Sequence, residues 1–223
     1  MNEVRPIHIS GYSRTHNDFY PTPPWVTATL LHHVKLRGSV WEPCCGNGAI
    51  ARVIESHGAK VHATDLIDHG FGQSGVDFFA CREFPAGCQA MVTNPPYGDG
   101  GAISRGAKAS KAMLGFVRHA LELTERAHGQ LALLVRFQWI AGKRASDLIG
   151  SGQLDAVIAL TRRITWFDMG EKTNQGQHHH AWLFWDCARD ANVPPRIVFA
   201  GSPVAVPPIR SKKRRLSANE IPA

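Results

Sequence analysis

The sequence lacks the features of a membrane-anchored, secreted or disulfide-linked protein. No apolar run in its 223 residues approaches the roughly 20 residues that span a bilayer. The first residues, MNEVRPIHIS, contain no apolar core of a secretory signal. The five cysteines are odd in number and show no C-x-x-C spacing, which argues against a disulfide framework or a zinc site. We therefore expect a cytoplasmic protein with reduced thiols and no membrane contact.

Positive charge is the compositional feature that stands out. The formal net charge is +7, and basic residues gather at 142–144, 162–164 and 210–215. This pattern is compatible with a polyanionic partner, although a solvated surface with a basic tail explains it equally well. The length suits one large α/β domain. We predict an N-terminal segment at 1–17, a domain at 18–191 and a proline-rich basic tail at 192–223.

Short apolar runs alternate with segments of helical periodicity. The predicted strands lie within 38–48, 59–66, 75–79, 89–97, 130–137, 154–161 and 178–187, and the predicted helices are 49–58, 111–129 and 143–152. Strands joined by helical crossovers form a mostly parallel sheet with helices on both faces. The sequence therefore predicts an α/β, doubly wound, seven-stranded fold of Rossmann type.

Ligands of such a sheet bind at the carboxyl ends of its strands, where several notable residues fall. The turn EPCCGNG (42–48) follows the first predicted strand, and its glycines allow the backbone to approach a ligand closely. Asp65 ends the second strand and can accept hydrogen bonds from both ribose hydroxyls of a nucleoside. The dinucleotide-binding pattern G-x-G-x-x-G is incomplete here, because its last position, 51, is alanine. The turn also offers no lysine for phosphates. A neutral or cationic nucleoside cofactor therefore fits better than a dinucleotide.

The stretch NPPY (94–97) stands at the end of the fourth predicted strand, where two prolines must end the hydrogen-bonded ladder. An aromatic exocyclic amine is a poor nucleophile, so an enzyme that alkylates it must hold acceptors against its N–H groups and fix the ring. The side-chain carbonyl of Asn94 and the backbone carbonyl of Pro95 can accept, and Tyr97 can stack on the base. The rigid pair Pro95 and Pro96 would stiffen this platform.

In combination, these motifs resemble the class I S-adenosylmethionine-dependent methyltransferases that act on the exocyclic amine of adenine in DNA, in the gamma order. The resemblance covers residues 18–187 and implies S-adenosylmethionine as cofactor, an antiparallel last strand at 178–187, and Asn94, Pro95, Pro96 and Tyr97 as the catalytic motif. The segment DFYPTPPW (18–25) resembles the N-terminal motif that lies against the cofactor methionine. The implied cofactor-binding residues are Tyr20, Thr22, Pro23, Glu42, Pro43, Cys44, Gly46, Gly48, Asp65, Leu66, Asp77 and Phe78.

The segment 161–186 is similar to the hairpin of small phage-encoded members of this family. The resemblance implies DNA as the partner, and we expect a monomer or homodimer. We find no segment long enough for an added target-recognition region, so we expect short or relaxed sequence specificity. DNA contacts are expected in the loops 98–111, 139–144 and 166–177 and beside them. The candidate DNA-binding residues are Arg105, Lys108, Lys143, Arg144, Arg163, Trp166 and Lys172.

Two other functions use the same residues. NPPY also occurs in methyltransferases that act on RNA or on protein glutamine, but the protein-modifying group has a helical domain ahead of the glycine turn that this sequence does not supply. An inactive nucleic-acid-binding module would have damaged motifs, whereas these are intact. Neighbours on a strand alternate faces, so histidines 178–180 cannot all converge on a metal, and we expect none. Trp182 and Trp185 are predicted to fill the core.

Overall fold

The computed structural model describes residues 20–96, 107–142, 145–146, 149, 153–166, 176 and 178–201. Its strands are β1 (Ser39–Glu42), β2 (Val61–Ala63), β3 (Cys88–Thr93), β4 (Gln130–Arg136), β5 (Leu154–Leu160), β6 (His180–Asp186) and β7 (Arg196–Ala200). Its helices are α1 (Pro24–His33), α2 (Ala49–Ser56), α3 (Ala107–Arg126) and α4 (Phe137–Ile140), with the 3-10 turn η2 at Phe78–Ala80. No described helix is long and apolar enough to cross a membrane.

The strands form one seven-stranded sheet in the order β2-β1-β3-β4-β6-β5-β7. Only β6 runs against its neighbours, and the other strands are parallel to one another. This confirms the predicted α/β sheet and the antiparallel strand at 178–187. Two of the prediction's details are wrong, at 75–79 and at 196–200.

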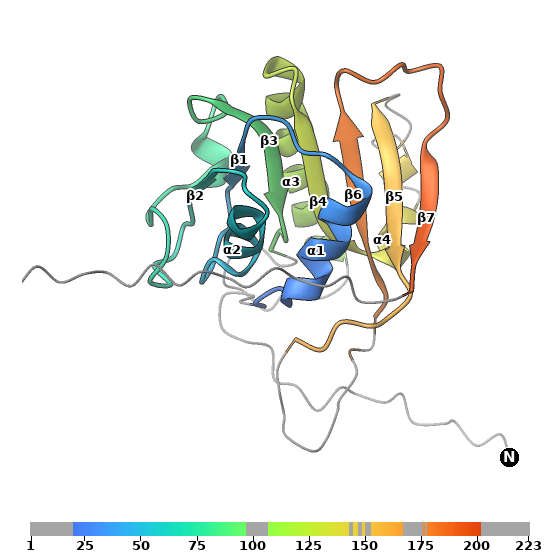
Figure 1. Ribbon diagram of the computed structural model, residues 1–223, viewed down its shortest axis with the longest axis horizontal. Helices are drawn as coiled ribbons and strands as arrows, with labels where there is room; N and C mark the ends of the chain where they lie inside the picture. The colour runs from blue at the N-terminus through green and yellow to red at the C-terminus, as the bar shows by residue number, and fades with distance from the viewer. Residues whose placement is uncertain are drawn as a thin grey trace, which may run out of the picture.

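Helices cover both faces of the sheet (Figure 1). On one face Val26 and Leu30 of α1 and Ile50 and Ile54 of α2 pack against the strands. On the other face α3 packs with Phe116 among its buried residues. Trp182 and Trp185 of β6 are fully buried on opposite faces, which confirms that they belong to the core.

The segment 75–79, predicted as a strand, is a turn. The Asp77 carboxylate accepts a hydrogen bond from the Phe79 N–H at 2.9 Å and begins the 3-10 turn η2. A side chain that bonds to the backbone in this way competes with strand pairing. The turn directs Phe78 into the core, where its ring stacks on Phe116 with centroids 4.4 Å apart. The apolar letters of this segment therefore reflect a core contact and not a ladder.

The seventh strand lies instead at residues 196–200, inside the segment that we predicted to be tail. β7 pairs parallel with β5, from Arg196 opposite Ala156 to Ala200 opposite Leu160. Val198 and Ala200 face the core on the α1 side. The predicted boundary at 192 is wrong in this respect, because a short strand between two prolines and a glycine carries too few residues to stand out in a proline-rich composition.

Helix α1 was not anticipated. Consecutive residues Val26, Thr27, Ala28, Thr29 and Leu30 are all buried, so the helix lacks the one-sided apolar pattern by which helices are recognised. Its start does carry a signal, because Pro24 stands at the first helical position, where a missing N–H costs nothing. The helix matters to function because it fixes the preceding residues 20–23 against the end of β3.

Candidate active site

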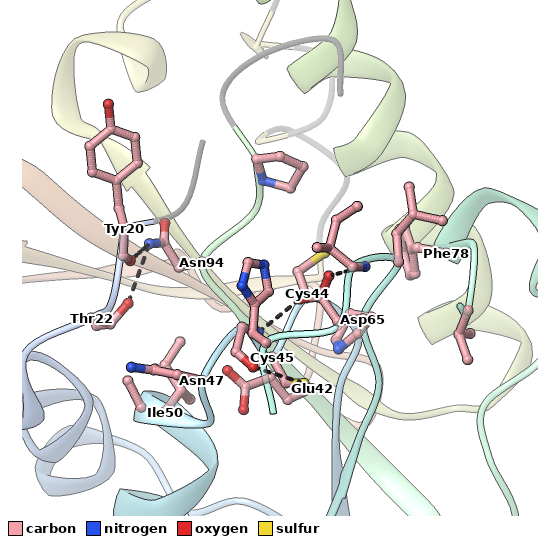
Figure 2. A pocket seen from close by; sticks show the side chains of 18 of the residues that line it. Tyr20, Thr22, Glu42, Cys44, Cys45, Asn47, Ile50, Asp65, Phe78 and Asn94 are labelled. Atoms are coloured by element: carbon pink, nitrogen blue, oxygen red, sulfur yellow. Dashed lines mark hydrogen bonds between the residues drawn. The ribbon is translucent and has the colours of Figure 1, made fainter. Parts of the chain in front are cut away.

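A cavity of about 440 Å³ opens at the carboxyl ends of β1, β2 and β3. This volume lies within the range of about 300–1,000 Å³ that is usual for small-molecule sites. Its walls come from residues 20–22, from the turn after β1, from the segments 65–69 and 76–79, from the end of β3 and from α3 (Figure 2). The sequence segments that were predicted to meet here do meet.

The glycine turn after β1 is held against Asp65, which follows β2. The Gly46 N–H donates to one carboxylate oxygen of Asp65 at 2.8 Å, and the Ile67 N–H donates to the other at 2.9 Å. A carboxylate oxygen has a second lone pair, so both oxygens can still accept from a ligand hydroxyl. Asp65 is therefore fixed in position before any ligand arrives.

Glycine is required in this turn for a specific contact. Gly48 has a φ of 79°, and a Cβ there would come within 2.5 Å of the Phe71 ring. Phe71 belongs to the loop after β2, and the Arg52 guanidinium lies 4.6 Å from its ring centroid. The loop thus packs over the start of α2.

Glu42 lies at the floor of the cavity with 1% of its surface exposed. Its carboxylate accepts a hydrogen bond from the Ala51 N–H at 2.9 Å, in the first turn of α2. Burial raises the pKa of Glu42 well above its usual range, and the nearby Asp65 raises it further, against the lowering effects of the Ala51 N–H and Arg52. A cation entering the cavity would reverse this balance.

Two thiols lie beside this carboxyl. Burial, followed by the negative charges around it, raises the pKa of Cys45 to about 12, and burial likewise raises the pKa of Cys44. Both side chains therefore stay protonated at neutral pH. A thiol, unlike a thiolate, is a poor nucleophile, so neither cysteine competes for an electrophile bound in the cavity.

An apolar surface forms the opposite wall. Leu66, Ile67 and Phe79 line the cavity while remaining 55%, 37% and 51% exposed. Behind them the backbone carbonyl of Phe78 lies 3.0 Å from Nε2 of His119 on α3, which fixes this wall to the helix. Large apolar side chains exposed on a cavity wall are typical of a surface that a ligand covers when the site is occupied.

Asn94, directly after β3, presents an unpaired acceptor to the cavity. Its Nδ2 lies 3.4 Å from the carbonyl oxygen of Tyr20 and 3.3 Å from Oγ1 of Thr22 (Figure 2). A carbonyl oxygen can only accept, so the amide nitrogen must face Tyr20. The Oδ1 of Asn94 is left buried, with no hydrogen-bond partner among the described residues.

Asn47 in the glycine turn repeats this pattern. Its Oδ1 is likewise buried without a partner in the described part of the chain, and the residue lines the same cavity. Buried polar atoms without partners are costly and are rare in native proteins. Two such carbonyl oxygens in one cavity point to a ligand that brings N–H donors.

Beyond Asn94 the rim of the cavity is aromatic and then basic. The rings of Tyr20 and Trp166 lie 5.6 Å apart, and Trp166 contacts His180 at 5.3 Å. Burial, assisted by the charge of Arg136, lowers the pKa of His180 to about 3. The Nε of Arg163 lies 3.4 Å from Nε2 of His179, so this side of the rim carries a second arginine.

The structure brings most of the predicted site residues together. Of the predicted cofactor-binding residues, all but Pro23 and Gly48 line the cavity, and those two support it from the adjoining turns. Asn94 and Pro96 line it, Pro95 is buried beside it, and Tyr97 lies outside the described residues. Sequence reasoning missed other lining residues, which are Pro21, Cys45, Asn47, Ala49, Ile50, Ile67, His69, Val76, Phe79, Ala112 and Phe116.

The structure describes fewer of the predicted DNA-binding residues. Arg163 and Trp166 lie on the rim described above, and Lys108 falls in the first turns of α3. Arg105, Lys143, Arg144 and Lys172 lie outside the described residues, as do most of the loops 98–111 and 166–177. Among the residues that are described, no cluster of histidine, cysteine or carboxylate side chains is arranged to hold a metal.

Comparison with known proteins identifies the architecture. No protein-family model matches the sequence, and a search of curated proteins found no similar sequence. Among solved structures, a candidate class I S-adenosylmethionine-dependent methyltransferase from Listeria monocytogenes superposes with a TM-score of 0.53 at 18% identity, over 81% of this chain and 65% of that one. The chain has the class I methyltransferase fold.

Two other structures with this fold are methyltransferase subunits of type I restriction systems. The subunit from Streptococcus thermophilus superposes with a TM-score of 0.54 at 15% identity, over 76% of this chain and 45% of that one. The M protein of EcoKI gives 0.50 at 16% identity, over 75% and 44%. The present chain thus spans less than half the length of either subunit. In this fold the cavity found here is the crevice at the carboxyl ends of the parallel strands.

Proposed function

We propose that this chain transfers a methyl group from S-adenosylmethionine to the exocyclic N6 amine of adenine in DNA. The observation that carries the proposal is the Oδ1 of Asn94, buried and without a partner among the described residues at the end of β3. It lies in a cavity whose other end offers a fixed carboxylate, Asp65, and an apolar wall. One end suits a nucleoside and the other suits an amine.

The lining residues fit S-adenosylmethionine in each of its parts. Asp65 would accept from the ribose hydroxyls, and Leu66, Ile67 and Phe79 would cover the purine. The cofactor's ammonium group would pair with the carboxylate form of Glu42 and donate to Oδ1 of Asn47, which would give a partner to an oxygen that has none among the described residues. When bound, the cofactor supplies an electrophilic methyl group on a sulfonium.

Asn94 and its neighbours would prepare the amine for attack. The lone pair of an aromatic amine is delocalised into its ring, and an acceptor on each N–H favours the pyramidal nitrogen that can bond to carbon. Oδ1 of Asn94 would supply one acceptor, and the backbone carbonyl of Pro95 would supply a second. Tyr20 and Thr22 hold the amide so that its oxygen, and not its nitrogen, faces the substrate.

The choice of nucleic acid rests on the rim. Trp166 lies against Tyr20, and Arg136, Arg162 and Arg163 stand at or just after the carboxyl ends of β4 and β5. Burial, followed by the charge of Arg136, lowers the pKa of both His178 and His180, so a cation stands close to both rings. With the net charge of +7, this favours a polyanion held by its phosphates, with the target base turned out of the stack.

DNA rather than RNA is proposed because the motif order resembles DNA adenine methyltransferases and because restriction-system subunits share the fold. The test incubates the full chain with S-adenosylmethionine and double-stranded DNA, single-stranded DNA or RNA. Mass spectrometry of the nucleosides then identifies the product. N6-methyladenosine found only in RNA, or modified cytosine, would overturn the proposal.

A matched pair of variants makes this test specific. Asn94→Ala removes the acceptor and should abolish the product. Asn192→Ala changes an exposed asparagine in the turn before β7 and should leave methylation intact. Equal loss in both variants would trace the effect to folding and not to the proposed role.

A further inference from the structure

Exposed apolar side chains of the described chain fall into two main groups. Leu66, Ile67 and Phe79 line the cavity and have a ligand to cover them under the proposed function. Ile197 and Phe199 of β7 are even more exposed, at 63% and 71%, and are remote from the cavity. β2 and β7 are the opposite edges of the sheet (Figure 1). A separate explanation is therefore needed for β7.

Some backbone N–H and C=O groups of β7 point away from β5 and are available to pair with another strand. The Ala200 carbonyl accepts from the Thr161 N–H at 3.1 Å, so the Ala200 backbone faces the β5 side. Backbone groups alternate in direction along a strand, so those of Val198 also face β5. Those of Ile197 and Phe199 face outward. β7 is the last strand of the sheet, and no described segment pairs with this outer side.

Natural proteins often place charged side chains on edge strands, which opposes pairing with another chain. β7 has little of this protection. Arg196 is the only charged residue of β7, and its guanidinium lies 3.4 Å from Asp155 and 2.8 Å from the carbonyl of His33. It is therefore engaged with its own subunit. Ile197 and Phe199 instead direct their backbone groups outward, while their exposed apolar side chains lie on the sheet face opposite Val198 and Ala200.

We propose that β7 pairs antiparallel with β7 of a second copy of this chain, about a two-fold axis at Val198. In this register Ile197 of one copy stands opposite Phe199 of the other, and these two residues would exchange both backbone hydrogen bonds. They are the residues whose backbone groups face outward. The strand is thus self-complementary in its backbone and in its side chains.

Charge and length also favour a second copy as the occupant. In this register Arg196 stands opposite Ala200 of the second copy, so no like charges face one another. Pro194 and Pro195 lack N–H groups and end the edge on one side, while β7 ends at Ala200 on the other. A second β7 has the matching length. The pairing would join two sheets and leave both cavities open.

This inference does not rest on the proposed function, and the full chain tests it. Sedimentation velocity should show a concentration-dependent dimer. Ile197→Lys and Phe199→Lys should each raise the dissociation constant by about tenfold or more, because each places a charge in the interface. Val193→Lys is the control, since Val193 is 54% exposed but lies outside the strand and should not change the dimer.

Hydrogen exchange on the unaltered chain gives a second measurement that needs no variant. Amide protection at Ile197 and Phe199 should rise with protein concentration if a second copy covers them. Protection that is independent of concentration would mean that another segment of the same chain occupies the edge, and it would overturn the proposal. A monomer at every concentration, or a dimer that survives both lysine variants, would overturn it as well.

Discussion

The amide nitrogen of Asn94 faces the backbone carbonyl of Tyr20 at 3.4 Å, and this contact fixes which atom of the amide meets the cavity. The two residues are far apart in sequence and come from different motifs. Residue 20 precedes α1, and residue 94 ends β3. The N-terminal segment therefore orients the amide whose oxygen is left without a partner among the described residues.

Asn94→Ala should reduce single-turnover methyl transfer by about 10²- to 10³-fold, the usual cost of one preorganised polar contact at a reacting centre. Cofactor affinity should change little, because the side chain faces the substrate end of the cavity. Single-turnover rates and calorimetric titration measure the two quantities separately. A variant that retains half of the normal rate would remove Asn94 from the mechanism.

Thr22→Val should have a smaller effect of the same kind. It removes one acceptor of the Asn94 amide nitrogen and leaves the Tyr20 carbonyl in place. Loss of one uncharged hydrogen bond costs about 1 kcal/mol, which corresponds to a rate reduction of roughly fivefold. Thr22→Ser is the control, because it keeps the hydroxyl. If both variants behave alike, the hydroxyl has no orienting role.

Motif order along the chain was enough to assemble most of the cavity. Parallel strands bring their carboxyl ends to one edge, so Glu42, Asp65 and Asn94 could be placed together without coordinates. Several missed residues, such as Cys45 and Ile67, are direct neighbours of predicted ones, and others come from packing between distant segments. Ala112 and Phe116 enter the cavity from α3. No local pattern in the sequence distinguishes such residues from ordinary core.

The errors in the fold have a related cause. Residues 75–79 do not form a strand, because the Asp77 carboxylate accepts a hydrogen bond from the Phe79 N–H and begins a 3-10 turn. A single side chain decides this outcome. β7 was overlooked because its alternation spans only five residues. Its pairing with β5 places apolar side chains next to a buried strand. The apolar surface buried in this way can be recognised only in the assembled sheet. Asn47 could have been suspected from its place between two glycines of the turn.

Asp65→Ala should weaken cofactor binding far more than it slows saturated turnover, because the ribose takes no part in bond making. The structure adds a second consequence. The same carboxylate holds the N–H groups of Gly46 and Ile67, so the unliganded variant should also melt at a lower temperature. Asp77→Ala is a useful comparison, since it removes a carboxylate from the cavity wall without touching the glycine turn.

Cofactor binding should release protons through Glu42. Its raised pKa means that the folded protein without cofactor keeps the carboxyl protonated to a higher pH than usual, with Asp65, Cys44, Cys45 and Arg52 as the ionisable neighbours. A cationic ligand favours the carboxylate, so affinity should fall as pH falls through the raised pKa. Calorimetry in buffers of different ionisation enthalpy measures the release.

Glu42→Gln should abolish this release. The control ligand is methylthioadenosine, which lacks the ammonium and sulfonium charges and should bind without releasing protons. Equal proton release with both ligands would assign the effect to another group and would separate Glu42 from the ammonium site.

His180 should make the protein less stable in mild acid. Its pKa is about 3 in the folded state, against 6.5 for an ordinary histidine, because the ring is buried beside Arg136. Between these values the unfolded chain binds a proton that the folded chain does not, so the free energy of unfolding falls as pH falls from about 6.5. His180→Phe should reduce the loss between pH 7 and pH 5 by up to about 2 kcal/mol.

Urea unfolding at the two pH values measures this difference. His62→Phe serves as the control for the substitution itself, because it replaces an exposed histidine on β2 by the same residue. An unchanged loss of stability in His180→Phe would show that the ring is not the group that titrates.

If the chain binds DNA as proposed, Arg163 should hold it through a phosphate. Arg163 is exposed beside His179 and is not engaged by a carboxylate among the described residues, so we expect it to contact a phosphate. Arg163→Ala should weaken DNA binding about equally for all sequences and reduce the slope of log affinity against log salt by about one. Arg126→Ala is the matched control, because that arginine is exposed at the end of α3 and paired with Glu122. Phosphate contacts position the duplex and carry no sequence information, so a base-resolution map of modified adenines on random DNA should not change in the Arg163 variant. A changed set of modified sites would mean that Arg163 reads a base edge, and an unchanged salt slope would place the phosphates elsewhere on the rim.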